Sequence, residues 1–279
     1  MLTEKEQETS PSLHKKTGGV MKRKRYLFFD IDGTLLAGGY LGYVPKSTEQ
    51  AMEKLKAAGH FLSIATGRAQ SMAAPYMHQL KIENMVSDGG HGITIGGELV
   101  GIEPLCKEHV AELIRECEER GFPWGLAIDN SDTRVVPDER FYEATHDDYI
   151  RCIVVPGLDP MEQENIYKAY VACREPEEYT LESLKNLPWC RYMPPYFFVE
   201  PTDKAVGIRK MMDYYHAPYS DAIVFGDGAN DMSMFTDEWT KVAMGNAIPE
   251  LKAKADLVTT DVDRDGIWNA CLELGLFED

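Results

Sequence analysis

The chain has 279 residues, of which 44% are apolar, so it can form a packed core and is long enough for two domains of ordinary size. Its 46 acidic residues outnumber its 29 basic residues, and the resulting net charge of −17 argues against nucleic acid or an anionic lipid surface as a partner. No segment approaches the roughly 20 apolar residues of a membrane span, and the six scattered cysteines predict free thiols in a reducing cytoplasm.

The N-terminal residues 1–20 are polar and predict a disordered tail. They contain no apolar stretch of the kind that a secretory signal needs. The basic run that follows, residues 22–25, is interpreted as a solvated edge ahead of the first strand rather than as a nucleic-acid site.

From residue 26 onward, short apolar runs alternate with helical patterns, first up to residue 90 and again after residue 197. Pro75 either kinks its helix or divides it into two pieces. Strands that are apolar on both faces and alternate with helices predict an α/β fold, a doubly wound (Rossmann-like) parallel sheet. The predicted strands are 26–30, 61–68, 84–90, 222–227, 241–245 and 256–260, and the predicted helices are 47–58, 69–80, 204–215, 229–236 and 266–273.

The middle of the chain has a different pattern, with a hairpin-like stretch at 93–101, a helix at 104–120 and strands at 124–129 and 133–136. This pattern predicts an inserted α+β domain at 90–197, and a core domain formed by 21–89 and 198–279. The aromatic-rich stretch 189–198 is interpreted as a strand that packs into the core of the inserted domain.

Two carboxylates, Asp30 and Asp32, follow the first strand in the sequence DIDGT. Ligands of parallel sheets bind beyond the carboxyl ends of the strands, so both side chains are expected at the functional edge. Like charges at this distance repel each other, and a divalent cation would compensate them.

Three further segments supply polar groups for the same edge. Thr66 ends the second strand in ATGR, Lys204 opens a helix, and the sequence GDGAND contributes Asp227, Asn230 and Asp231. Carboxylate oxygens suit Mg²⁺, and the hydroxyl, lysine and amide groups provide donors for phosphoryl oxygens.

In type and order, these four segments resemble the haloacid dehalogenase (HAD) superfamily, and in particular its Cof-type phosphatases with an α/β cap inserted between the second and third motifs. Each motif alone has a common structural explanation, such as a turn, a helix cap or a solvated lysine. Their joint occurrence at both ends of the chain favours the enzymatic interpretation.

The resemblance implies that Asp30 is the nucleophile and forms an aspartyl-phosphate, while Asp32 protonates the leaving oxygen and then deprotonates the attacking water. It also implies that Asp30, Asp227 and the backbone carbonyl of Asp32 hold Mg²⁺, with Asp231 helping directly or through water. The residues implied in binding the phosphoryl group are Thr66, Gly67, Lys204 and Asn230.

The sequence departs from the family pattern where the third strand ends. The family usually has Asn-Gly there, and this chain has Asp88-Gly89. A carboxylate at this position either repels a substrate phosphate or hydrogen-bonds a sugar hydroxyl. The approach to Lys204 also looks shorter than the family's usual connection.

The resemblance implies a Mg²⁺-dependent phosphatase that acts on a small phosphorylated metabolite, such as a sugar phosphate or a phosphorylated cofactor. A phosphomutase or phosphotransferase with the same intermediate is the alternative. A non-catalytic protein that binds phosphorylated ligands is less favoured, because every catalytic position is filled. The inserted domain would supply the specificity contacts. The sequence does not indicate an oligomeric state.

Overall fold

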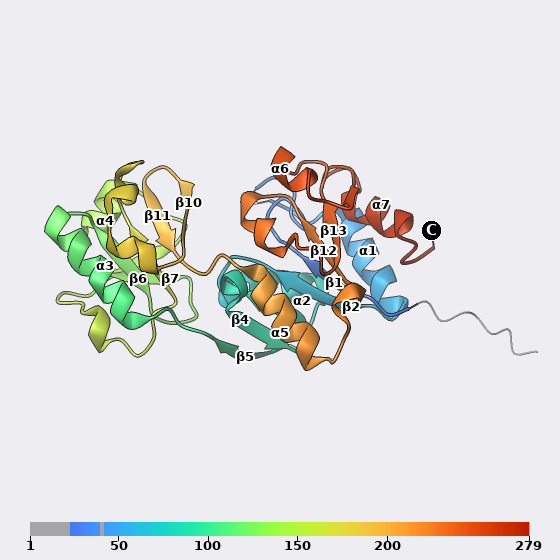
Figure 1. Cartoon of the computed structure of the whole chain (residues 1–279), viewed down its shortest axis with the longest axis horizontal. Helices are drawn as coiled ribbons and strands as arrows, with labels where there is room; N and C mark the ends of the chain where they lie inside the picture. The colour runs from blue at the N-terminus through green and yellow to red at the C-terminus, as the bar shows by residue number, and fades with distance from the viewer. Residues whose placement is uncertain (1–22, 40–41, 279) are drawn as a thin grey trace, which may run out of the picture.

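The computed structural model describes residues 23–39 and 42–278, which form two lobes lying side by side (Figure 1). The tail predicted at 1–20 lies outside the described residues. The larger lobe contains an eight-stranded sheet. In spatial order its strands are β14 (Leu257–Val258), β13 (Thr240–Ala243), β12 (Ala222–Gly226), β1 (Tyr26–Phe29), β2 (Phe61–Ala65), β3 (Asn84–Ser87), β4 (Gly92–Ile95) and β5 (Glu98–Ile102).

The six strands from β14 to β3 are parallel, which confirms the predicted α/β fold with a parallel sheet. The hairpin β4–β5 extends this sheet with antiparallel pairing to β3. The prediction that the inserted domain begins at residue 90 is therefore wrong in one respect: residues 92–102 pair with the larger sheet. The chain passes to the smaller lobe only after β5.

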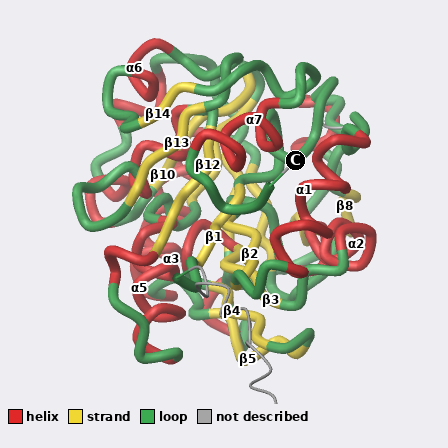
Figure 2. The backbone as a smooth tube through the Cα atoms, turned by 90° about the vertical axis from the view of Figure 1, so that its right-hand side faces the viewer, coloured by secondary structure: helices red, strands yellow, loops and turns green. Residues whose placement is uncertain are grey.

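Helices cover both faces of the larger sheet because successive strand residues point to opposite sides. Leu27 and Phe29 pack in one apolar cluster with α1 (Lys46–Ala57), α2 (Gln70–Leu80) and α7 (Gly266–Glu273), whereas Phe28 packs in another with α5 (Lys204–Tyr214) and α6 (Pro249–Lys252). Figure 2 shows α5 on one side of strands β1 to β3, and α1 and α2 on the other. Pro75 lies inside α2, which continues past it as one helix.

Short 3₁₀ helices complete the larger lobe. They are η1 (Asp88–Gly90), η5 (Tyr219–Asp221) and η6 (Ala229–Met234). The sequence predicted an ordinary helix at 229–236, and the structure has the shorter η6 there. No helix in the described ranges combines the length and the apolar character that crossing a lipid bilayer requires.

The smaller lobe is built on a six-stranded sheet. One face is covered by α3 (Lys107–Arg120), whose Leu113, Ile114 and Cys117 pack against strand residues such as Leu126 and Val171. The opposite face carries a separate apolar cluster that includes Ala127, Tyr170 and Phe198. The other elements are β10 (Trp189–Met193), β11 (Tyr196–Val199), β9 (Lys168–Val171), β6 (Trp124–Ala127), β7 (Thr133–Val136), β8 (Arg151–Val154), α4 (Arg140–Thr145), η2 (Pro160–Glu162), η3 (Glu177–Thr180) and η4 (Ser183–Asn186).

Candidate active site

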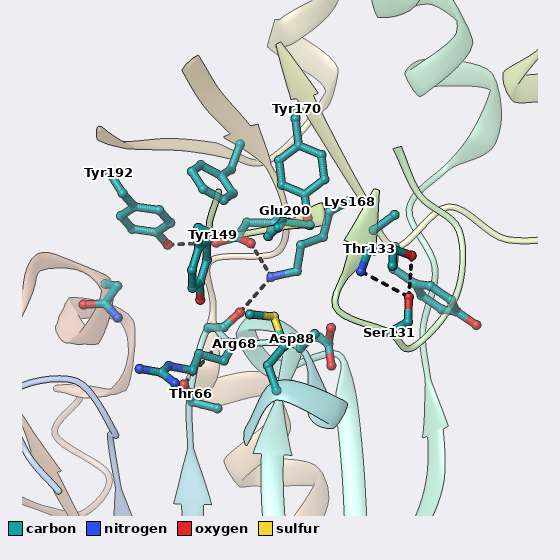
Figure 3. A pocket seen from close by; sticks show the side chains of 18 of the residues that line it. Thr66, Arg68, Asp88, Ser131, Thr133, Tyr149, Lys168, Tyr170, Tyr192 and Glu200 are labelled. Carbon is teal, nitrogen blue, oxygen red and sulfur yellow. Dashed lines mark hydrogen bonds and ion pairs between the residues drawn. The ribbon is translucent and has the colours of Figure 1, made fainter. Parts of the chain in front are cut away.

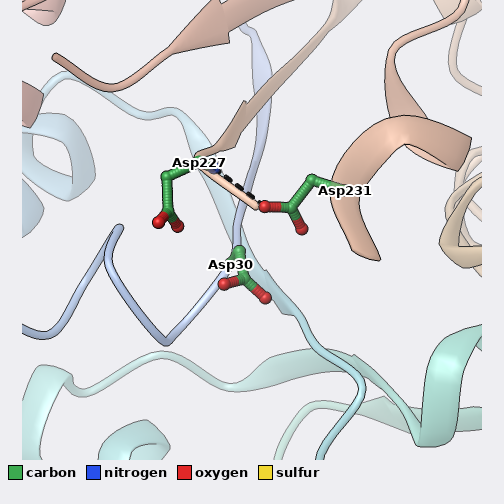
Figure 4. A group of neighbouring side chains, drawn as sticks. All are labelled: Asp30, Asp227 and Asp231. Atoms are coloured by element: carbon green, nitrogen blue, oxygen red, sulfur yellow. Dashed lines mark hydrogen bonds between the residues drawn. The ribbon is translucent and has the colours of Figure 1, made fainter. Parts of the chain in front are cut away.

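A cluster of three carboxylates lies at the carboxyl ends of the central strands (Figure 4). Asp30 follows β1 directly, and its N–H donates to the carbonyl of Phe225 in β12 at 3.0 Å. Asp227 follows β12, so the parallel pairing of β1 and β12 brings both carboxylates to one edge. Each of Asp30, Asp227 and Asp231 offers an oxygen that lies within 4.8 Å of those of the other two.

Lys204 connects this cluster to α5. Its ammonium group donates to Oδ1 of Asp30 and to Oδ1 of Asp231, both at 2.6 Å, and its side chain is only 1% exposed. The second oxygen of Asp231 accepts the N–H groups of Asp227 and Gly228 at 2.8 and 2.9 Å. Segments that are 174 and 27 residues apart in sequence therefore meet at one buried ammonium group.

The charges of the cluster do not balance without a cation. Burial and the like charge of Asp231 raise the pKa of Asp30 well above its usual value, and Lys204 opposes this rise. The same two causes raise the pKa of Asp227 to about 7. Burial alone would lower the pKa of Lys204, but the carboxylates of Asp231 and Asp30 outweigh it and raise this pKa. When all three carboxylates are ionised, they leave two negative charges against the one lysine, which a divalent cation with oxygen ligands would match.

Asp227 is held in place by two side chains that the sequence analysis did not assign. Thr34 Oγ1 donates to Oδ1 of Asp227 at 3.1 Å, and Asn246 Nδ2 donates to Oδ2 at 3.3 Å and to the carbonyl of Gly33 at 2.8 Å. Gly33 has a φ of +83°, and a Cβ atom there would lie 2.1 Å from Oδ2 of Asp227. The close approach of the backbone to this carboxylate therefore requires glycine.

Asp32 points away from the cluster and pairs with Arg68. Arg68 donates from Nε to Oδ2 at 2.8 Å and from Nη2 to Oδ1 at 2.5 Å, in the two-pronged geometry that suits a carboxylate. The Asp32 side chain is 43% exposed, whereas that of Arg68 is buried and also donates to Tyr76 at 3.2 Å. The Asp32 side chain is not part of the three-carboxylate cluster, and the metal-binding role of its backbone carbonyl stays a prediction.

A pocket of about 440 Å³ lies between the two lobes, next to Asp32 (Figure 3). Thr66, Gly67 and Asn230, which are three of the four predicted phosphoryl-binding residues, line it from the larger lobe, whereas Lys204 does not; their role stays a prediction. Thr66 follows β2, and its Oγ1 accepts the N–H of Arg68 at 3.1 Å. The second lobe lines the pocket from the sheet face opposite α3, with residues that include Ala127, Tyr170 and Phe198.

Three contributing residues were missed from the sequence, although each had a signal. Thr34 lies within DIDGT, Arg68 follows Thr66 and Gly67, and Asn246 follows the end of β13. A polar side chain at the carboxyl end of a strand next to β12 is a candidate by position alone. No local pattern, however, indicates that Asn246 donates to the carbonyl of Gly33, which is 213 residues away in sequence.

The fold and the site define an α/β enzyme with buried carboxylates at the strand ends, below a pocket that a second lobe completes. A family model described as haloacid dehalogenase-like hydrolase matches residues 27–271, so the chain belongs to this family. The chain is 30% identical over 262 residues to "Putative phosphatase YkrA" of Bacillus subtilis, which covers 91% of this chain and 99% of that protein.

Solved structures agree with this assignment. A Geobacillus kaustophilus protein of no stated activity is 33% identical with a TM-score of 0.79, covering 91% of this chain and 100% of that one. The HAD subclass IIB sugar phosphatase BT4131 is 28% identical with a TM-score of 0.73 and the same coverage. The protein is accordingly a phosphohydrolase that acts on phosphorylated substrates.

Proposed function

We propose that the protein is a Mg²⁺-dependent phosphatase that hydrolyses a small phosphorylated metabolite through an aspartyl-phosphate on Asp30. The observation that carries the proposal is the ammonium group of Lys204, held at 2.6 Å from both Asp30 and Asp231 at the strand ends. Lys204 opposes the rise in the pKa of Asp30 that burial and Asp231 cause, and it adds positive charge where a phosphoryl group would bind.

The metal would be held by Asp30, Asp227 and Asp231, together with the backbone carbonyl of Asp32. The two uncompensated negative charges of the cluster and its all-oxygen donors support a hard divalent ion. When bound, Mg²⁺ neutralises charge on the carboxylates and on the phosphoryl oxygens. The remaining chemistry is carried by side chains of the chain itself.

In the first step an oxygen of Asp30 attacks phosphorus, and the bond from phosphorus to the leaving oxygen breaks. Asp32 gives its proton to that oxygen, so the leaving group departs as an alcohol. In the second step Asp32 takes a proton from water, the water oxygen attacks phosphorus, and inorganic phosphate is released from the regenerated Asp30. Arg68 fixes the direction of the ionised Asp32 carboxylate, which is the form that takes the proton from water in the second step.

Thr66, Gly67 and Asn230 are the groups that we assign to the non-reacting phosphoryl oxygens, because they line the pocket beside Asp32. A volume of about 440 Å³ suits a small metabolite rather than a polymer. Sugar phosphates and phosphorylated cofactors are the proposed classes, and the sugar phosphatase among the similar structures supports this choice. The six cysteines are free thiols, which supports action in the reducing cytoplasm.

The test is phosphate release from p-nitrophenyl phosphate and from a panel of phosphorylated metabolites, with Mg²⁺ and with EDTA. Asp30→Asn should lower kcat by at least 1,000-fold because it removes the nucleophile. Asp138→Asn is the control, since Asp138 is an exposed carboxylate that pairs with Arg140. Wild-type activity that persists in EDTA, or an active Asp30→Asn variant, would contradict the proposal. A hexose phosphate that is isomerised without release of phosphate would indicate a mutase instead.

A further inference from the structure

The wall of the pocket beyond Asp32 contains two cations, and each is paired with a carboxylate. Arg68 binds Asp32 through two hydrogen bonds. Lys168, in β9, donates to Oε2 of Glu200 at 2.5 Å and to the carbonyl of Gly67 at 2.8 Å. Figure 3 shows the Lys168 side chain reaching from the second sheet toward the turn that follows β2, with Glu200 beside it. Neither cation is left over to bind a second anionic group.

Carboxylates outnumber cations among the described lining residues. Asp88 and Asp129 line the pocket in addition to Asp32 and Glu200, so four formal negative charges stand against two positive ones. Asp88 is almost fully buried, and one of its oxygens accepts the N–H of Gln70 at 3.2 Å. A ligand with a carboxylate or a second phosphate in this part of the pocket would meet like charge in a partly desolvated environment.

The same carboxylates are acceptors for neutral ligand donors. Glu200 is 2% exposed, and its other oxygen already accepts the hydroxyl of Tyr192 at 2.8 Å and the thiol of Cys190 at 3.6 Å. Each carboxylate oxygen has more than one lone pair, so a ligand hydroxyl or N–H group can add a further hydrogen bond. A ligand donor would add to the hydrogen bonds already present, whereas a ligand anion in the same place would meet lone pairs and negative charge.

Part of the remaining wall is apolar and aromatic. Tyr170 and Phe198 lie with their ring centroids 5.4 Å apart, and Tyr192 and Phe198 with theirs 5.1 Å apart. Met72 and Ile150 line the pocket as well. Such surfaces accept a ring or another apolar face of a ligand.

We propose that this pocket selects phosphomonoesters whose leaving group is uncharged, offers hydroxyl or N–H donors and has an apolar face, and that the Lys168–Glu200 pair determines this selection. The inference rests on the proposed phosphatase function, since it assigns the pocket to the leaving group. It goes further by excluding leaving groups that carry a carboxylate or a second phosphate.

Two aryl phosphates that differ in one group provide the test: 4-(hydroxymethyl)phenyl phosphate and 4-carboxyphenyl phosphate. They are similar in size, and only the second has an anionic leaving group. The wild-type enzyme should hydrolyse the hydroxymethyl ester with a kcat/KM at least tenfold higher. Equal values, or a preference for the carboxylate, would overturn the proposal.

A variant tests whether the pair causes the preference. Glu200→Gln removes the carboxylate that neutralises Lys168, so the carboxyl ester should gain and the ratio of the two kcat/KM values should fall at least fivefold. Asp138→Asn changes the net charge equally outside the pocket and should leave the ratio unchanged. If Glu200→Gln does not fold, Asp129→Asn in the exposed part of the wall should lower the ratio by at least twofold. An unchanged ratio in the folded variant would refute the role of the charges.

Binding to Asp30→Asn separates this inference from the proposed function. Calorimetry should give a dissociation constant at least tenfold lower for the hydroxymethyl ester than for the carboxyl ester. If the wild-type enzyme hydrolyses neither ester nor p-nitrophenyl phosphate, but Asp30→Asn keeps this preference, then the selection holds and the phosphatase proposal fails. If p-nitrophenyl phosphate is hydrolysed but Asp30→Asn binds the two esters equally or binds neither, then the selection fails and the phosphatase proposal holds.

Discussion

Replacement of Arg68 by lysine tests whether Asp32 depends on its two-pronged contact. Lysine keeps the positive charge but presents a point charge on a flexible chain, so it cannot make both hydrogen bonds in a fixed direction. The contact joins Nε and Nη2 of Arg68 to the two oxygens of Asp32 at 2.8 and 2.5 Å. We expect Arg68→Lys to leave Asp32 with a cationic neighbour but poorly oriented.

The loss of activity expected in Arg68→Lys can be estimated from the strength of the Arg68–Asp32 hydrogen bonds and the exposure of Asp32 to solvent. A hydrogen bond to a charged group contributes about 1.5–3 kcal/mol when it is well buried. The Asp32 side chain is 43% exposed, which lowers the value of this contact to about 1–2 kcal/mol. At about 1.4 kcal/mol for each factor of ten, the expected loss is about 5- to 30-fold in the step in which the proposed mechanism has Asp32 donate a proton.

The assay compares two substrates by kcat/KM, which covers the steps up to formation of the phosphoenzyme. An alkyl phosphate needs a proton on its leaving oxygen and should lose the full 5- to 30-fold, whereas p-nitrophenyl phosphate leaves readily without one and should lose less than about threefold. Tyr76→Phe is the matched control because it removes only the hydrogen bond at 3.2 Å on the far side of Arg68. Equal losses on both substrates would mean that Arg68 does not act through Asp32.

Three further changes have defined outcomes. Gly33→Ala would place a Cβ atom 2.1 Å from Oδ2 of Asp227, so we expect the Mg²⁺ concentration for half-maximal activity to rise at least tenfold while circular dichroism stays unchanged; an unaltered Mg²⁺ requirement would contradict this. Mg²⁺ at 100 times its dissociation constant should stabilise the wild-type protein by about 2.7 kcal/mol in urea unfolding, and Asp227→Asn should reduce this gain. Burial raises the pKa of Glu116, but hydrogen bonds from Ser183, Glu182 and Arg120 outweigh it and lower this pKa to about 2. Because the pKa of Glu116 is lower in the folded than in the unfolded chain, this group stabilises the fold at pH values above its unfolded pKa, and the contribution is lost as the pH falls. Between pH 5 and 3 the free energy of unfolding of the wild type should therefore fall by about 1 kcal/mol more than that of Glu116→Gln, after allowance for solvent screening. Parallel curves of stability against pH would refute the assignment.

The strands of the larger sheet are readable from sequence because the apolar run in each is bounded by turn residues. The hairpin at 93–101 was also readable as a hairpin, since Gly96 and Gly97 supply its turn with positive φ angles. The sequence did not predict which sheet this hairpin joins, because its pairing with β3 depends on contacts such as that between Met85 and Thr94 rather than on the hairpin's own pattern. Residues 229–236 have a helical pattern, but Asp231 turns its carboxylate back to the N–H groups of Asp227 and Gly228, and the segment forms the 3₁₀ helix η6.

The motifs and the pocket differ in how much a sequence can reveal about them. The residues around Asp30 stand at strand ends, where a short pattern with fixed spacing marks each one. No short sequence pattern marks the charged residues in the wall of the pocket beyond Asp32. Asp88 follows β3, Lys168 lies in β9 and Glu200 follows β11, and they meet only when both lobes are in place. Lys168 looks like an ordinary strand lysine until its ammonium group is found between Glu200 and the carbonyl of Gly67. Local sequence motifs therefore indicate the residues proposed for phosphoryl transfer. The proposed choice of leaving group depends instead on buried charges that pair over long sequence distances. A substitution at Lys168 or Glu200 would accordingly change the preferred substrate without altering any motif.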